Sequence, residues 1–137
     1  MSPAAARWRR RTAGESEFTR FDFRDLAELR AVDIFQPDLA ICGGITEGMR
    51  IAALASAHQI ELAPHLWGGA LMFAAGLHVC AVSPSAVIAE YSLGPNPMLH
   101  ELAEEQFPVE DGYVAVPSRP GLGVTVRDEF VKRNAVT

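Results

Sequence analysis

The sequence predicts an α/β fold built on parallel β-α-β units. Two short apolar segments, residues 32–38 and 60–65, are separated by a glycine-containing turn and a segment with helical spacing. A strand, a turn, a helix of about a dozen residues and a second strand follow one another in this order in a parallel β-α-β unit. Both segments end in an ionisable residue, Asp38 and His65. Because the functional groups of such folds lie where the parallel strands end, both residues are candidates for a catalytic site.

The composition is that of a globular domain. The chain has 137 residues, of which 49% are hydrophobic and 21% are charged, and its net charge is −5. This acidic balance argues against nucleic acid as a partner. No apolar stretch reaches the roughly 18 residues of a membrane span, so no membrane association is expected. The two cysteines, Cys42 and Cys80, are far apart, which predicts reduced thiols and a cytoplasmic location.

The first 13 residues carry a run of arginines without apolar periodicity. We predict an irregular basic leader over residues 1–13 and a single domain over residues 14–137. Phe23, Leu26 and Leu29 recur every third residue with charged residues between them, which predicts a short amphipathic helix.

The turn after residues 32–38 contains Gly43-Gly44. A tight turn is the favoured interpretation, and a phosphate-binding turn ahead of a helix is the alternative. Thr46 is the predicted N-cap of the helix that follows. Four residues would share one face of this helix: Ile51, Leu54, Ala55 and His58.

A second, mostly apolar helix is predicted after Gly68-Gly69. Five residues would lie on one face of it: Ala70, Phe73, Ala74, Leu77 and Ala81. Gly76 inside this helix costs up to about 1 kcal/mol relative to alanine, which is tolerable if another group packs close to it.

Residues 86–91 predict a third strand, which again ends beside a carboxylate, Glu90. From about residue 92 prolines and glycines predict an irregular tail. Within this tail, Asp111-Gly112 predicts a hairpin turn, and residues 126–133 predict a short helix.

The pairing of Asp38 with His65 is the central chemical prediction. Neighbouring parallel strands lie about 4.8 Å apart, so side chains at equivalent strand ends can reach hydrogen-bond contact. An aspartate beside a histidine fixes the tautomer of the imidazole ring and makes the ring a better general base. The alternative is an ion pair without a catalytic role. Three other histidines are interpreted as structural or surface residues: His58, His78 and His100.

Four stretches of the sequence together resemble a known family. They are Gly14-Glu15, VDIFQPDLAICGGITEGMRIAALASAHQIELAPH, Glu90 and DGYVAVPSRPGLGV. They resemble the C-terminal half of the mandelate racemase/muconate lactonizing enzyme branch of the enolase superfamily. The resemblance implies about units 5–8 of a modified TIM (β/α) barrel, with the capping domain and the first strands absent. It also implies a Mg²⁺-dependent enzyme that removes the proton next to a carboxylate, either an acid-sugar dehydratase or a racemase.

The same resemblance assigns roles to individual residues. It implies that Glu15 is a Mg²⁺ ligand, that Asp38 and His65 form a catalytic dyad in which His65 moves the proton, and that Glu90 hydrogen-bonds the substrate carboxylate. Glu17 is the alternative to Glu15, and Glu90 could instead be a simple surface carboxylate. Trp67 is expected either to line the substrate pocket or to pack at the barrel mouth. The expected partner is a small hydroxy-carboxylate, an acid sugar.

The sequence also departs from the family pattern. The first two metal carboxylates and the lysine base of the family have no counterpart before Glu15, and a single carboxylate makes a weak Mg²⁺ site. The second hypothesis is therefore a truncated, catalytically silent half-barrel fragment. Such a chain would depend on a complementary barrel half, or would associate with copies of itself. The sequence does not select a particular acid sugar.

Overall fold

A three-stranded parallel sheet is the centre of the fold. The computed structural model describes residues 10–136. Within them, β1 (Thr12–Ala13), β2 (Ile34–Phe35) and β3 (Glu61–Leu62) lie in the order β1-β2-β3, and all are parallel. An isolated parallel bridge between Leu62 and Ala86 continues the pairing beyond β3. The described residues therefore form an α/β structure with parallel strands, as the sequence predicts.

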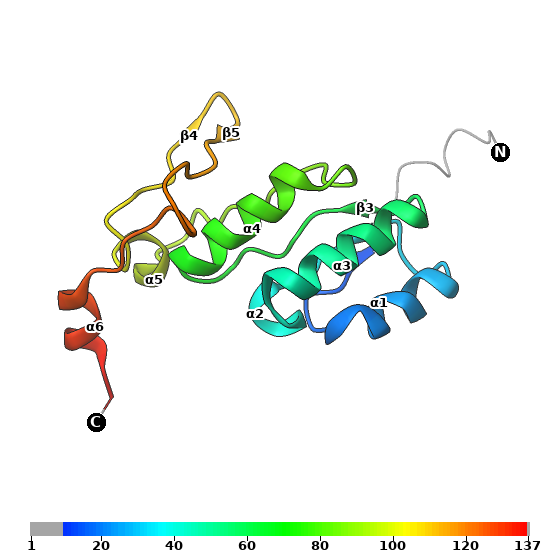
Figure 1. The fold of residues 1–137 in the computed structure, drawn as a ribbon, viewed down its shortest axis with the longest axis horizontal. Helices are drawn as coiled ribbons and strands as arrows, with labels where there is room; N and C mark the ends of the chain where they lie inside the picture. Colours follow the sequence, from blue (N-terminus) through cyan, green and yellow to red (C-terminus); the bar gives the residue numbers. More distant parts are fainter. Residues whose placement is uncertain (1–9, 137) are drawn as a thin grey trace.

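Each strand of the parallel sheet is followed by one or two helices (Figure 1). The helices among the described residues are α1 (Thr19–Glu28), α2 (Leu39–Cys42), α3 (Gly44–Ala57), α4 (Ala70–Val82), α5 (Pro97–His100) and α6 (Asp128–Asn134). An antiparallel hairpin, β4 (Val109–Glu110) and β5 (Tyr113–Val114), follows α5. No helix within residues 10–136 is long and apolar enough to cross a membrane.

Two hydrophobic cores hold the described residues together. The first lies between the sheet and helices α1 and α3, where the rings of Phe23 and Phe35 meet edge to face at 5.0 Å. The second surrounds α4, where Phe73 contacts the rings of Tyr91 and Phe107 at 5.2 and 4.9 Å. The segment after residue 92 contains α5, the hairpin and α6, and packs against α4 through Leu99, Ala103 and Phe107.

The first part of the chain differs from the prediction at the end of the basic leader. Thr12 and Ala13 form β1, because backbone pairing with β2 and the bond from Arg11 N to Asp33 Oδ2 (2.9 Å) order this edge. Residues 1–9 of the predicted leader lie outside the described residues. The predicted amphipathic helix is confirmed as α1, with Phe23 buried, but Leu29 lies beyond its end and is exposed.

The segment between Asp38 and α3 also differs from the prediction. Residues 39–42 form a short helix, α2, where a turn was expected. Gly43 has a φ of +115°, ends α2 and precedes the first residue of α3, so Thr46 is not the N-cap.

Of the predictions for the chain after residue 69, two hold only in part or fail and two are confirmed. Helix α4 is confirmed, but Ala81 on its predicted face is exposed. Residues 86–91 do not form a strand: only Ala86 bridges to Leu62, and the side chains of Val87 and Ile88 are exposed. The hairpin at Asp111-Gly112 and the final helix are confirmed.

Candidate active site

Asp38 and His65 meet at the ends of neighbouring parallel strands. The two residues form an isolated parallel bridge, and Asp38 Oδ2 lies 2.9 Å from His65 Nδ1. The other oxygen of Asp38, Oδ1, accepts a hydrogen bond from the Ala40 N–H at 2.7 Å, so that Asp38 also caps α2. Asp38 is only 5% exposed. Both oxygens of this buried carboxylate are therefore engaged, and its position is fixed.

The orientation of His65 leaves one ring nitrogen available. The backbone N–H of His65 donates to the Pro37 carbonyl at 3.1 Å, which holds the His65 backbone beside Asp38. An ionised carboxylate only accepts hydrogen bonds, so Nδ1 carries the hydrogen of the bond to Asp38. When the ring is neutral, Nε2 then has a free lone pair. The geometry is that of a general base held by an acidic partner.

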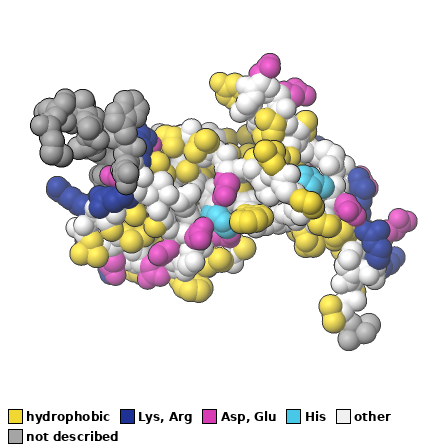
Figure 2. Space-filling model, turned by 180° about the vertical axis from the view of Figure 1, so that it is seen from behind, with side chains coloured by type: hydrophobic (Ala, Val, Ile, Leu, Met, Phe, Trp, Pro, Cys, Tyr) yellow, Lys and Arg dark blue, Asp and Glu magenta, His cyan; other side chains and the backbone are white. Residues whose placement is uncertain are grey.

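Two further carboxylates face the free nitrogen. Glu15 Oε2 lies 3.6 Å and Glu90 Oε2 lies 3.9 Å from His65 Nε2. Glu90 Oε2 also accepts from the Leu66 N–H at 3.1 Å. The side chains of Glu15 and Glu90 are 64% and 41% exposed, so both can meet a ligand from solvent. Figure 2 shows a histidine bordered by acidic side chains near the middle of one face.

Close packing fixes the backbone on both sides of these groups. Gly14 has a φ of +131°, and a Cβ there would meet the Phe23 ring and the Gln36 backbone nitrogen at 2.6 and 3.0 Å. Gly76 of α4 packs directly against the Leu66 side chain, as the sequence analysis required for a glycine inside this helix. The residues that precede Glu15 and follow His65 are thus held by tight contacts.

The remaining predicted residues lie as follows. Trp67 lies two residues after His65, and 67% of it is exposed; a substrate contact and packing at the barrel mouth both stay predictions. His58 ends α3 and is exposed, His78 Nε2 lies 3.3 Å from the Leu122 carbonyl, and His100 ends α5. Within residues 10–136 no hydrogen bond or ion pair joins these three histidines to Asp38 or His65, and their interpretation as structural or surface residues stays a prediction.

The described residues do not fit a complete magnesium site. Within residues 10–136 no group of three or more His, Cys, Asp or Glu side chains is arranged to hold a metal ion. Mg²⁺ prefers near-octahedral coordination by six oxygens at about 2.1 Å. Glu15 offers one exposed carboxylate, so most of the six ligands would have to be other groups.

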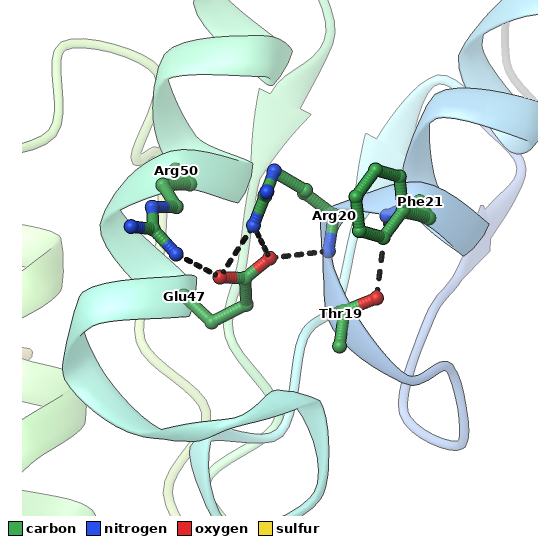
Figure 3. Close-up of polar contacts among 5 residues, drawn as sticks. All are labelled: Thr19, Arg20, Phe21, Glu47 and Arg50. Carbon is green, nitrogen blue, oxygen red and sulfur yellow. Dashed lines mark hydrogen bonds and ion pairs between the residues drawn. The ribbon is translucent and has the colours of Figure 1, made fainter.

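Sequence reasoning missed an ionic cluster between helices α1 and α3. Glu47 of α3 is buried and accepts hydrogen bonds from Arg20 and Arg50 (Figure 3). The Arg20 backbone N–H and the Arg50 guanidinium lower the pKa of Glu47 to about 2, against the opposing effect of burial. Arg20 and Glu47 are 27 residues apart, and neither helical nor strand periodicity links residues at that separation.

Comparison with known proteins places this geometry in context. Residues 4–130 match the family described as enolase C-terminal domain-like. A D-galactonate dehydratase of Ralstonia pickettii (strain 12J) is 42% identical over 125 residues, which are 87% of this chain and 33% of that protein. The chain thus spans about a third of the length of the curated relatives it matches.

Solved structures give the same result. A mandelate racemase/muconate lactonizing enzyme from Sulfitobacter sp. superimposes with a TM-score of 0.86 and 31% identity, covering 98% of this chain and 33% of that one. A member of the enolase superfamily from Polaromonas sp. JS666 gives a TM-score of 0.84 and 37% identity, covering 92% of this chain and 34% of that one.

Proposed function

Because the chain belongs to the enolase C-terminal domain-like family, we propose that its site removes the proton next to the carboxylate of a hydroxy acid. The observation that carries this proposal is the hydrogen bond between Asp38 and His65 Nδ1 at 2.9 Å, which leaves Nε2 free to take a proton. The parallel order β1-β2-β3, continued by the Ala86 bridge, further supports an assignment of the chain to about units 5–8 of a (β/α) barrel.

His65 is the proposed general base. Its Nε2 would accept the proton from the carbon next to the substrate carboxylate, and the electron pair of the broken C–H bond would pass into that carboxylate. Asp38 would stabilise the imidazolium that forms, because an anion beside Nδ1 favours the charged ring. A positioned base of this kind contributes about 10²–10⁴-fold to such a reaction.

Glu90 and Glu15 are the proposed contacts to the substrate and to a cation. Two carboxylates within 4 Å of Nε2 would repel an anionic hydroxy acid unless a proton or a cation compensates the charge. A protonated Glu90 could donate a hydrogen bond to the substrate carboxylate. Glu15 is the proposed carboxylate partner of a cation, and Mg²⁺ stays a prediction because the described residues form no complete site. Trp67 is proposed to contact the substrate.

Dehydration is the proposed outcome after proton removal. In a dehydratase, the electron pair held in the substrate carboxylate returns to form a C=C bond to the next carbon, and the hydroxyl group of that carbon takes up the proton carried by His65 and leaves as water. In a racemase a proton returns to the same carbon instead. The name D-galactonate dehydratase among relatives that are 38–42% identical favours an acid sugar and dehydration. A cytoplasmic location stays a prediction.

The second candidate is a catalytically silent chain. It is favoured by the lack, within residues 10–136, of a three-residue metal cluster. In that case the Asp38–His65 pair would be in place, but the developing negative charge of the substrate would find too little compensation for proton removal.

Proton exchange tests the proposal without requiring the full reaction. The purified chain is incubated in D₂O with Mg²⁺ and D-galactonate, and the loss of the proton next to the carboxylate is followed by ¹H NMR. We expect exchange with the wild-type chain and none with His65→Asn. The matched control is His58→Asn, because His58 is exposed and ends α3.

Each result decides between the two candidates. Exchange that requires His65 supports the proposed base. Equal exchange in His65→Asn would remove that role, and no exchange in the wild-type chain, with the fold intact by circular dichroism, would establish the silent alternative.

A further inference from the structure

We propose that Glu47 is a positioning residue: through the backbone N–H of Arg20, it holds the loop that carries Glu15 against the Asp38–His65 pair. Glu47 is in the first turn of α3, and Arg20 is in the first turn of α1 (Figure 3). For the role of Glu15 this inference rests on the proposed function, whereas the geometric claim does not.

The contacts of Glu47 bridge two helices. Oε1 accepts from the Arg20 backbone N–H at 2.9 Å and from Arg20 Nη1 at 2.7 Å. Oε2 accepts from Arg20 Nη1 at 2.9 Å and from Arg50 Nη1 at 2.8 Å. The Glu47 side chain is 8% exposed, so solvent screens these bonds little. Four hydrogen bonds on one buried carboxylate leave it little freedom to move.

The bond to the Arg20 backbone explains why α1 begins where it does. The first N–H groups of a helix have no partner inside the helix and are normally satisfied by a capping side chain. The N-cap of α1 is Phe18, whose side chain cannot accept a hydrogen bond, and Thr19 has a strained φ of +57°. Glu47 supplies the missing acceptor from another helix, at the end of α1 where a negative charge is favourable.

The same carboxylate lies close to the segment that carries Asp38. Asp38 caps α2, and α2 ends at Gly43, directly before α3. A Cβ on Gly43 would lie 3.2 Å from Glu47 Cβ, so this turn packs against the Glu47 side chain. Glu47 therefore connects the segment after β1 with the segment after β2.

Glu15 depends on this connection because it has few contacts of its own. Its side chain is exposed, and within residues 10–136 its one ion pair is the 3.6 Å approach to His65 Nε2. The loop is held at its start by the packing of Gly14 and at its end by the bond from Arg20 to Glu47. Between these anchors the Glu17 N–H donates to the Gly14 carbonyl at 3.4 Å, and the Phe18 N–H donates to Asp22 Oδ2 of α1 at 2.8 Å. Because the Asp22 contact is itself carried by α1, release of α1 from Glu47 should let the loop shift and move Glu15 away from His65.

The test measures whether the carboxylate of Glu15 still changes the Nε2 resonance of His65. Long-range ¹H–¹⁵N spectra of the histidine rings are recorded at one pH for the wild-type chain, Glu15→Gln, Glu47→Gln and the double variant. We expect Glu15→Gln to shift the His65 Nε2 resonance in the wild-type background, and most of this shift to be lost in the Glu47→Gln background. An equal shift in both backgrounds, or none in either, would overturn the inference.

The matched control is Glu101→Gln. It breaks the Arg133–Glu101 ion pair (2.9 Å), which links the end of α5 to α6 and has no contact with Glu15. In this background the shift caused by Glu15→Gln should be unchanged. No substrate is needed, so a chain that shows this coupling but no proton exchange would refute the proposed function and leave the role of Glu47 standing.

A second measurement applies if Glu47→Gln does not fold. Amide hydrogen exchange of Arg20 in the wild-type chain should be as slow as that of the α3 interior, because its N–H is bonded to a buried carboxylate. Exchange as fast as in the exposed loop at residues 15–17 would overturn the inference without any variant.

Discussion

Replacement of Gly76 by alanine should displace Leu66 and thereby shift the neighbouring site residues His65 and Glu90. Gly76 lies inside α4, and an added methyl group would collide with the buried Leu66 side chain. Leu66 follows His65 directly, and its N–H is the donor that holds Glu90 at 3.1 Å. A displacement of Leu66 would therefore move two residues of the site at once.

The size of the effect is the difference between two opposing contributions. An extra methyl group in a well-packed core costs about 1–3 kcal/mol. Alanine is favoured over glycine in a helix interior by about 1 kcal/mol. The expected net loss for Gly76→Ala is about 0–2 kcal/mol, which corresponds to a decrease in Tm of up to about 8 °C for a domain of this size.

Thermal unfolding of four proteins measures this balance: the wild-type chain, Gly76→Ala, Leu66→Ala and the double variant. Leu66→Ala removes the colliding side chain and alone costs about 2–5 kcal/mol. In that background Gly76→Ala should become stabilising by about 1 kcal/mol, because only the helix propensity remains. If Gly76→Ala raises Tm equally in both backgrounds, the two residues are not in tight contact and the reasoning is refuted.

Three further predictions follow from the same contacts. Asp38→Asn should slow proton exchange by about 100-fold or more, since an amide no longer selects the tautomer with hydrogen on Nδ1; an unchanged rate would contradict this. Phe73→Ala should cost about 3–5 kcal/mol in urea unfolding, because its ring is buried against two other rings, whereas the exposed Leu93→Ala should cost almost nothing. The pKa of Glu47 is about 2 in the folded chain and about 4.3 when unfolded. The stability that ionised Glu47 contributes is thus present above about pH 4.3 and is lost as the pH falls through about 2. The difference in Tm between the wild-type chain and Glu47→Gln should narrow from pH 6 to about pH 2.5; a constant difference would disprove the assignment.

The central β-α-β unit could be predicted from the sequence because its signals are local. Apolar runs that end in Asp38 and His65, separated by a segment of helical length, define two adjacent strand ends. The observed strands, Ile34–Phe35 and Glu61–Leu62, are shorter than the predicted ones. An isolated parallel bridge between Asp38 and His65 nevertheless pairs the two predicted ends beyond them.

Two differences arise where tertiary contacts outweigh local pattern. Thr12 and Ala13 form an edge strand although arginines precede them, because Arg10 pairs with Glu61 of β3 and Arg11 pairs with Asp33, the residue before β2. The arginines thus lie at the edge of the sheet and are not buried in it.

The opposite case is residues 86–91, which favour a strand by composition. Only Ser85 and Val87 on either side of Ala86 bond to Leu62: the Leu62 N–H donates to the Ser85 carbonyl at 2.7 Å, and the Val87 N–H donates to the Leu62 carbonyl at 3.0 Å. Further along, the Tyr91 hydroxyl donates to the Phe107 carbonyl at 2.9 Å, and its ring packs on Phe73. These contacts direct the segment toward α4, and Glu90 reaches the site from an irregular backbone.

The most direct test of the account is the tautomer of His65, which depends on neither a substrate nor a metal. Long-range ¹H–¹⁵N spectra of the neutral ring distinguish hydrogen on Nδ1 from hydrogen on Nε2. We predict hydrogen on Nδ1 in the wild-type chain, shared with Asp38 across 2.9 Å, and loss of this preference in Asp38→Asn. A wild-type ring that carries its hydrogen on Nε2 would leave no lone pair facing Glu15 and Glu90, and would contradict the proposed base.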